Sequence, residues 1–83
     1  MIDVKETSIE EITEKLEFAK VRFKRCVLVT KSGNIVTHLE IYCSPIIMDG
    51  QIAFLKTLFA GENVRIAGFT NQELITIHPI KQP

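Results

Sequence analysis

The chain carries one pattern twice: a stretch with helical periodicity is followed by an apolar run, a short polar turn and a second apolar run. The first copy extends from about Ser8 to Cys43, and the second extends from about Asp49 to Ile80. A helix followed by a hairpin, taken twice, predicts an α+β, two-layer sandwich with helices packed on a sheet. The 83 residues have room for a single domain, which we place at residues 1–83.

The first helix is predicted to begin near Ser8 and to end between Lys20 and Lys24. Ser8 and Glu11 have the spacing of a capping box, which satisfies free N–H groups at a helix start. The apolar positions that follow recur three and four residues apart, as one face of a helix requires. These positions are Ile9, Ile12, Leu16, Ala19 and Phe23.

The first hairpin is predicted from two apolar runs that flank the turn at residues 32–34. The run at residues 26–30 is continuously apolar and β-branched, which is typical of an inner strand covered on both faces. In the returning strand, residues 35–43, the odd positions are mostly apolar. The even positions after Val36 are polar or aromatic, so one face of this strand meets solvent or a partner.

The second half is predicted to hold a helix that starts at Asp49 and ends before Gly61. Strands at residues 63–69 and 73–80 follow. A short strand at residues 2–4 could precede the first helix, so the order is written (β)αββαββ. With that strand the order is ferredoxin-like plus one strand; without it, the order is a circular permutation of the ferredoxin-like fold.

Residues 46–60 also allow a second interpretation. Residues 47–52 contain Asp49-Gly50, a favoured pair for a tight hairpin turn. An N-terminal helix would then precede five strands, which resembles the element order of Sm-like barrels, and that resemblance implies RNA binding in rings. The spacing after Gly33 departs from the Sm pattern, and the Asp-x-x-Met-Asn stretch is absent. We therefore favour the helix.

Composition narrows the class of protein. Ten acidic and ten basic residues cancel, which argues against a general nucleic-acid binder. The chain has no apolar run long enough to span a membrane, and its start lacks the basic and apolar regions of a signal peptide, so we expect a cytoplasmic protein. A 46% apolar content in so short a chain favours a homo-oligomer and gives no reason to expect a membrane partner.

The best candidate binding site lies on the polar face of the strand at residues 35–43. Alternate residues of a strand share one face, so His38, Glu40 and Tyr42 are predicted to lie together. A histidine, a carboxylate and a phenol can transfer protons. The simplest interpretation is a solvent face, and beyond that we favour contact with a protein partner over catalysis. No catalytic residue is predicted.

A second candidate is the basic end of the first helix. Acidic residues lie early and basic residues late, which complements the helix dipole. The same cations could instead bind the phosphates of a nucleic acid. The residues concerned are Lys20, Arg22, Lys24, Arg25 and, from farther along the chain, Arg65.

The two cysteines are predicted to be buried structural thiols. A two-residue turn at Gly33-Asn34 would place Cys26 opposite Ile41, with Cys43 diagonal to it on the same face. His38 would then lie on the other face. No pair among the histidines and cysteines has ligand spacing on a shared helix or loop, so no metal site and no cofactor are expected.

The sequence therefore predicts a small non-catalytic protein-interaction or regulatory module that forms a homo-oligomer. The alternative is an RNA- or other nucleic-acid-binding module that uses the basic cluster. An enzyme that uses His38 and Glu40 is the third hypothesis.

Overall fold

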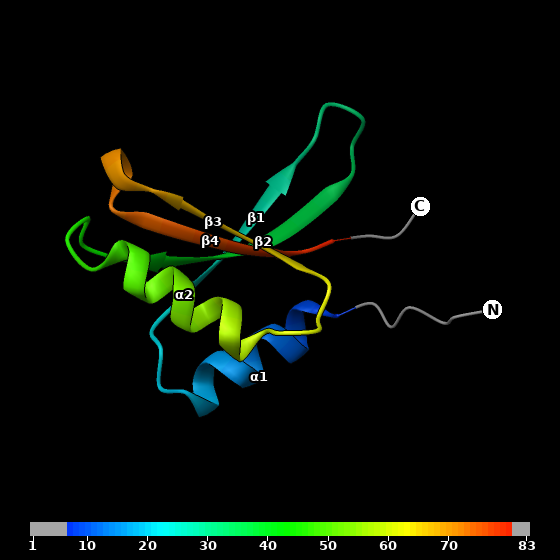
Figure 1. The fold of residues 1–83 in the computed structure, drawn as a ribbon. Coiled ribbons are helices and arrows are strands. Elements are labelled where there is room, and N and C mark those ends of the chain that lie inside the picture. The colour runs from blue at the N-terminus through cyan, green and yellow to red at the C-terminus, as the bar shows by residue number, and fades with distance from the viewer. Residues whose placement is uncertain (1–6, 81–83) are drawn as a thin grey trace.

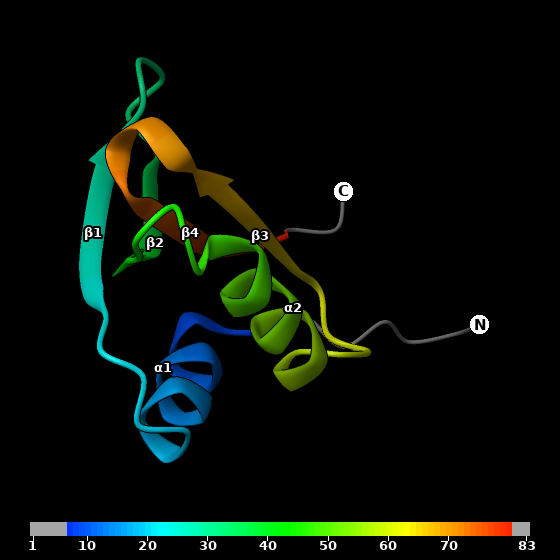
Figure 2. The ribbon, with the colours of Figure 1, turned by 60° about the vertical axis from the view of Figure 1, so that its left-hand side comes forward.

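The structure is a computed structural model that describes residues 7–80, and it contains two helices and a four-stranded antiparallel sheet. Both helices lie on the same face of the sheet (Figures 1 and 2). The small α+β prediction is confirmed at this level. The elements are α1 (Ile9–Phe18), β1 (Lys24–Val29), β2 (Ile35–Tyr42), α2 (Met48–Leu58), β3 (Val64–Phe69), the 3₁₀ turn η1 (Thr70–Gln72) and β4 (Leu74–Pro79). The strand proposed at residues 2–4 lies outside the described residues.

Helix α1 begins as the capping pattern predicts and ends earlier than expected. The Ser8 hydroxyl accepts a hydrogen bond from the Glu11 N–H at 3.2 Å. At the other end Lys20 has a positive φ of 59°, and the Val21 N–H donates to the Leu16 carbonyl at 2.9 Å. This left-handed cap reverses the chain, so the helix cannot continue toward residue 24.

Helix α2 occupies the segment for which two interpretations were open. It spans Met48–Leu58, so a hairpin at residues 47–52 and the Sm-like element order do not apply. Asp49 lies in the first turn instead of capping the helix, because Ile47 is the capping residue. In the part of the chain from residue 7 to residue 80, no helix is long and apolar enough to cross a membrane.

The core forms between the helices and the two central strands, in a sheet ordered β1-β2-β4-β3. Strands β2 and β4 point their odd-numbered residues toward the helices, and α1 and α2 cover them. The even-numbered residues point to the opposite side, called here the open face. The buried apolar residues are Ile12, Leu16, Leu39, Ile41, Cys43, Met48, Leu55, Phe59, Ile75 and Ile77.

The register of the first hairpin differs from the prediction. The Thr30 N–H donates to the Asn34 carbonyl at 2.8 Å, so the loop between them has three residues and not two. Gly33 takes the positive φ of 85° that such a loop needs at its last position. As a result Cys26 lies opposite His38 instead of Ile41, and every β1 side chain changes face.

Strand β1 is an edge strand, so the prediction of an inner strand was wrong. Only Leu39–Tyr42 of β2 pair with β4, and the end of the β1–β2 hairpin extends past the sheet (Figure 1). Neither helix covers that end. Its apolar run is therefore exposed on both faces. A strand buried on both faces has the same continuous apolar pattern in its sequence.

Candidate functional site

The open face carries the residues that the sequence singled out. His38, Glu40 and Tyr42 lie on this face of β2, as their spacing predicts. The His38 Nε2 and Glu40 Oε2 atoms are 3.1 Å apart, and both side chains are more than three-quarters buried. Tyr42 is exposed at the end of the strand. The first two residues therefore form a fixed polar pair, and the third stands apart from them.

The corrected register adds Cys26 to this pair. Cys26 of β1 is directly opposite His38 and is half-buried on the open face. One potential ligand atom from each of Cys26, His38 and Glu40 lies within 4.8 Å of the other two. Cys43 is buried on the opposite side of the sheet, and both thiols are free. The predictions that the two cysteines share a face, and that His38 points away from Cys26, were therefore wrong.

The protonation of this cluster follows from its contacts. The hydrogen bond from His38 lowers the pKa of Glu40, against the opposing effect of burial. Burial raises the pKa of the Cys26 thiol, and the hydrogen bond and negative charge of Glu40 raise it further. A nucleophilic cysteine needs the opposite shift, toward the thiolate. The direction of this shift therefore gives no sign of an activated nucleophile at Cys26.

His78 of β4 belongs to the same face, next to the cluster. The β2–β4 register, carried one pair past Leu39 and Ile77, places His78 opposite His38. On its other side His78 pairs with Arg65 of β3. Burial lowers the pKa of His78, and the charges of Arg65 and His38 lower it further. His78 therefore loses its proton more readily than an isolated histidine does.

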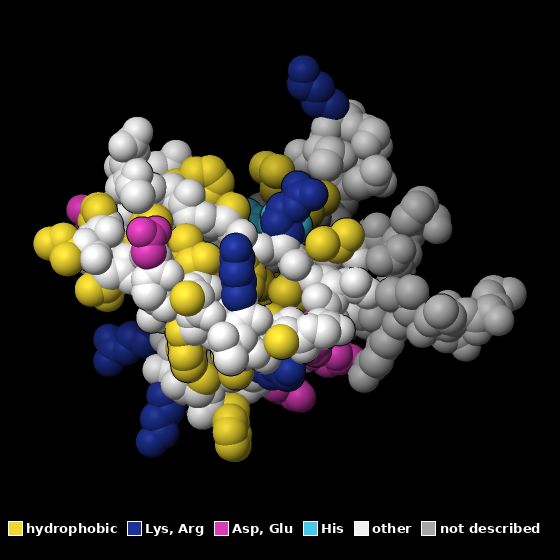
Figure 3. Space-filling model, in the orientation of Figure 1, with side chains coloured by type: hydrophobic (Ala, Val, Ile, Leu, Met, Phe, Trp, Pro, Cys, Tyr) yellow, Lys and Arg dark blue, Asp and Glu magenta, His cyan; other side chains and the backbone are white. Residues whose placement is uncertain are grey.

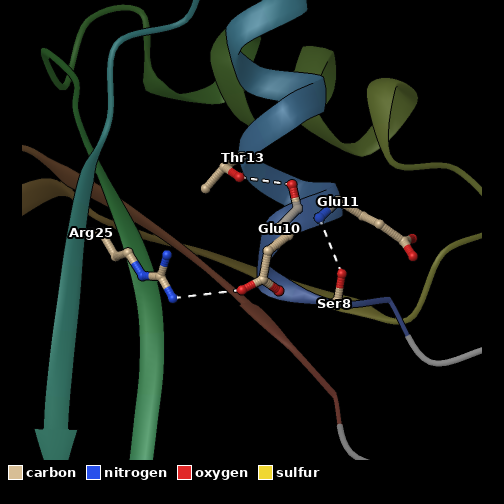
Figure 4. A network of polar contacts seen from close by, with 5 residues as sticks. All are labelled: Ser8, Glu10, Glu11, Thr13 and Arg25. Carbon is tan, nitrogen blue, oxygen red and sulfur yellow. Dashed lines mark hydrogen bonds and ion pairs between the residues drawn. The ribbon is translucent and has the colours of Figure 1, made fainter.

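The basic residues do not converge on one surface. Arg25 points to the helix side of β1 and pairs with Glu10 of α1 at 3.8 Å (Figure 4). Lys24 lies opposite Glu40 on the open face, whereas Arg65 is on β3, at the far edge of the sheet. Lys20 lies at the end of α1. In Figure 3 the Lys and Arg side chains are scattered over the visible surface.

Arg22 lies in the connection between α1 and β1. With Lys24 it lines a shallow depression of about 350 Å³, together with Phe23 and Tyr42. Two cations and an exposed phenol thus meet at the base of the hairpin.

Five of the large apolar residues that are exposed within residues 7–80 lie at the end of the β1–β2 hairpin. We call this surface the hairpin patch, and it consists of Val27, Leu28, Val29, Ile35 and Val36, which are between 41% and 68% exposed. A groove of about 740 Å³ runs beside it, between the hairpin, the start of α1 and the end of β4. The apolar run at residues 26–30 was the signal in the sequence, but it was assigned to the core.

The backbone of β1 is also available on one side. Within residues 7–80, β2 is the only strand that pairs with β1. The hydrogen bond from Thr30 to Asn34 makes these two residues a hydrogen-bonded pair, and hydrogen-bonded and non-hydrogen-bonded pairs alternate along an antiparallel ladder. The backbone groups of Leu28 and Cys26 therefore bond to β2. The N–H and C=O groups of Val27 and Val29 therefore point outward (Figure 2 shows this edge).

No protein-family model, curated protein or solved structure matches the chain. The residues of the chain itself are therefore the only basis for an inference about function. Two features distinguish the described part of the chain: the hairpin patch with its free strand edge, and the cluster of Cys26, His38 and Glu40.

Proposed function

We propose that this chain is a non-catalytic protein-interaction module that forms a homodimer by pairing the free edge of β1 with β1 of a second copy. The observation that carries this proposal is an edge strand whose outward backbone groups pair with no other strand within residues 7–80, in the middle of an exposed apolar surface. Such an edge is a template for strand addition. Soluble proteins generally protect such edges, and pairing with an identical edge protects both at once.

The area of the hairpin patch fits a partner of this size. Its five side chains together expose on the order of 500 Å² of apolar surface, divided between the two faces of the hairpin. Each subunit of a standard interface buries about 800 Å², of which about 65% is apolar in homodimers. A partner that covers both faces of the hairpin would thus bury about the apolar area that one half of a homodimer interface needs.

The order of residues along β1 suits antiparallel pairing about a two-fold axis. With the axis at Val27, each Val27 pairs with its copy and each Val29 pairs with Arg25 of the other chain. The outward-pointing backbone groups at these positions then meet each other. Lys24 and Arg25 of the two copies lie at opposite ends of the joint ladder, so like charges stay apart.

The two other hypotheses have less support. A nucleic-acid surface needs cations that follow one phosphate backbone, whereas Arg25 and Arg65 lie on different faces and different strands. An enzyme that uses the open face needs an activated group, whereas burial raises the pKa of the Cys26 thiol. A homodimer needs neither a continuous row of cations nor an activated catalytic group.

The test is the mass in solution as a function of protein concentration. Sedimentation equilibrium should show the 9.4 kDa chain approaching twice its mass. Val27→Pro removes one outward N–H without removing a bond to β2, so it should give a folded monomer. Val29→Lys, which leaves the backbone intact, should do the same by placing two charges in the interface.

The matched control is Ile46→Thr, because Ile46 is 92% exposed and lies outside the hairpin. It should leave the mass unchanged. A wild-type chain that stays monomeric at high concentration would refute the proposal, as would a dimer that persists in both folded hairpin variants. Material that absorbs at 260 nm and is released by salt would instead support the nucleic-acid hypothesis.

We also propose that the fold is a circular permutation of the ferredoxin-like arrangement. The support is the sheet order β1-β2-β4-β3, which follows from the ferredoxin-like order when its first strand is moved to the end of the chain. In this arrangement β4 lies between β2 and β3, which α2 connects. A permuted chain that begins with β4 and ends with β3 should therefore fold, and its circular dichroism spectrum should match that of the parent.

A further inference from the structure

We propose that Cys26, His38 and Glu40 form a binding site for a divalent transition-metal ion of the Zn²⁺ class. The three side chains offer a thiolate sulfur, an imidazole nitrogen and a carboxylate oxygen, which are the three donor types that Zn²⁺ accepts in proteins. Their ligand atoms already converge to within 4.8 Å of one another. This proposal is independent of the homodimer and does not require it.

The distances are close to those of a metal site. Tetrahedral coordination with bonds of about 2.0 to 2.3 Å places ligand atoms about 3.3 to 3.6 Å apart. His38 Nε2 and Glu40 Oε2 are 3.1 Å apart, so this pair is slightly closer than the required separation. The largest separation among the three ligand atoms would have to shorten by about 1 Å. Rotation of the Cys26 side chain about one bond can supply a movement of that size.

The backbone holds the three ligands on rigid elements. Cys26 and His38 form a directly opposed pair across β1 and β2, and Glu40 is the next residue on the same face of β2. Ligands fixed by paired strands lose less freedom on binding than ligands on loops. The side chains of His38 and Glu40 are more than three-quarters buried and Cys26 is half-buried, so the ion would be partly shielded from bulk water.

The charges in the cluster also fit a divalent cation. A thiolate and a carboxylate together carry two negative charges, and His38 ligates as a neutral ring. Lys24, which is opposite Glu40, partly offsets the carboxylate. Coordination releases the thiol proton of Cys26 to solvent, since the thiolate is the ligand. Solvent takes the fourth position, as in zinc sites with three protein ligands.

Titration with Co²⁺, a spectroscopic substitute for Zn²⁺, tests this site on the full chain. A thiolate ligand produces a charge-transfer band in the near ultraviolet, and we expect one ion per chain. Cys26→Ala should abolish the band, whereas Cys43→Ala, at the buried thiol on the other side of the sheet, should retain it. His38→Gln and Glu40→Gln should each weaken binding by about tenfold or more.

Zn²⁺ alone provides a second readout, because a ligand of the folded state raises the Tm. At a hundredfold excess over the Kd, the wild-type Tm should rise by about 10 to 20 °C, and the Tm of Cys26→Ala should not rise. Far-ultraviolet circular dichroism verifies that each variant is folded. A folded wild type without the band, or a band that survives in Cys26→Ala, would overturn the proposal, as would unchanged affinity in both His38→Gln and Glu40→Gln.

Discussion

Gly68 of β3 reports on how closely α2 packs against the sheet. It faces the helix, and a Cβ atom added there would lie 2.5 Å from Ile52 Cδ1 and 3.0 Å from Met48 Sδ. Both distances are shorter than ordinary van der Waals contact. The close approach of the helix, and not the backbone conformation of Gly68, is therefore what makes an added Cβ crowded at this position. A substitution at this position tests the packing directly.

The size of the effect follows from two opposing terms. Gly68→Ala should gain about 0.5 to 1 kcal/mol, because alanine loses less backbone freedom on folding than glycine. The crowding against Ile52 and Met48 should cost about 1 to 3 kcal/mol. The net result is a loss of about 1 kcal/mol. Ile52→Val deletes the Cδ1 atom itself, which costs about 1 kcal/mol in the wild-type chain.

A double-mutant cycle isolates the contact. In the Gly68→Ala chain, Ile52→Val removes the atom that is crowded, so the second substitution should cost little or raise the stability. The coupling free energy should be about 1 to 2 kcal/mol. Urea unfolding of the four proteins at one protein concentration measures it, since dimer formation makes stability depend on concentration.

The matched control is Gly50→Ala in the first turn of α2, where an added Cβ has no heavy atom within 4 Å. This substitution should stabilise the protein by up to about 1 kcal/mol. If the two substitutions at Gly68 and Ile52 were additive within about 0.5 kcal/mol, α2 would not pack on β3 at this distance. The inferred position of the helix would then be wrong.

Two further predictions concern the hairpin loop and the open face. Gly33→Ala should cost about 1 to 2 kcal/mol in urea unfolding because the φ of Gly33 is +85°, and Gly33→Asn should cost less; equal costs would contradict the three-residue loop. Burial and the charges of Arg65 and His38 depress the pKa of His78 in the folded protein, so its contribution to stability is present above the ordinary value of 6.5 and is lost as the pH falls through the folded pKa. The free energy of unfolding should therefore fall less with acid in His78→Gln than in the wild type, and identical pH profiles would contradict this assignment.

The parts of the fold that depend on local periodicity were predictable. The stripe containing Ile12 and Leu16 and the capping interaction of Ser8 each involve residues within one or two turns of a helix. The alternation that buries Leu39 and Ile41 involves neighbours in one strand. The end of α1 was missed because a lysine takes a left-handed position at which glycine is the usual signal.

The site was hidden by a difference of one residue in a loop. A two-residue turn and a three-residue loop around Gly33 are both compatible with the sequence. They differ in which side chains of β1 lie on the open face of the sheet and which lie on the helix side. Only the three-residue loop places Cys26 across from His38. The spacing of His38 and Glu40 was a visible signal for two of the three residues of the cluster, and the third ligand depended on the register.

The position of β1 in the sheet could not be inferred from its own residues. A strand covered on both faces and a strand exposed on both faces give the same run of apolar residues, as Val27, Leu28 and Val29 show. The order of strands depends on contacts between segments far apart in the chain. The hydrophobic pattern therefore predicted a strand correctly and its environment incorrectly.

Hydrogen exchange at β1 tests the proposed homodimer most directly. The N–H groups of Val27 and Val29 point to the free edge, whereas those of Cys26 and Leu28 bond to β2. Exchange at Val27 and Val29 should slow as the protein concentration rises, while exchange at Cys26 and Leu28 is already slow in the dilute protein. Rapid exchange at Val27 and Val29 at every concentration would show that the edge stays open, which would contradict assembly through β1.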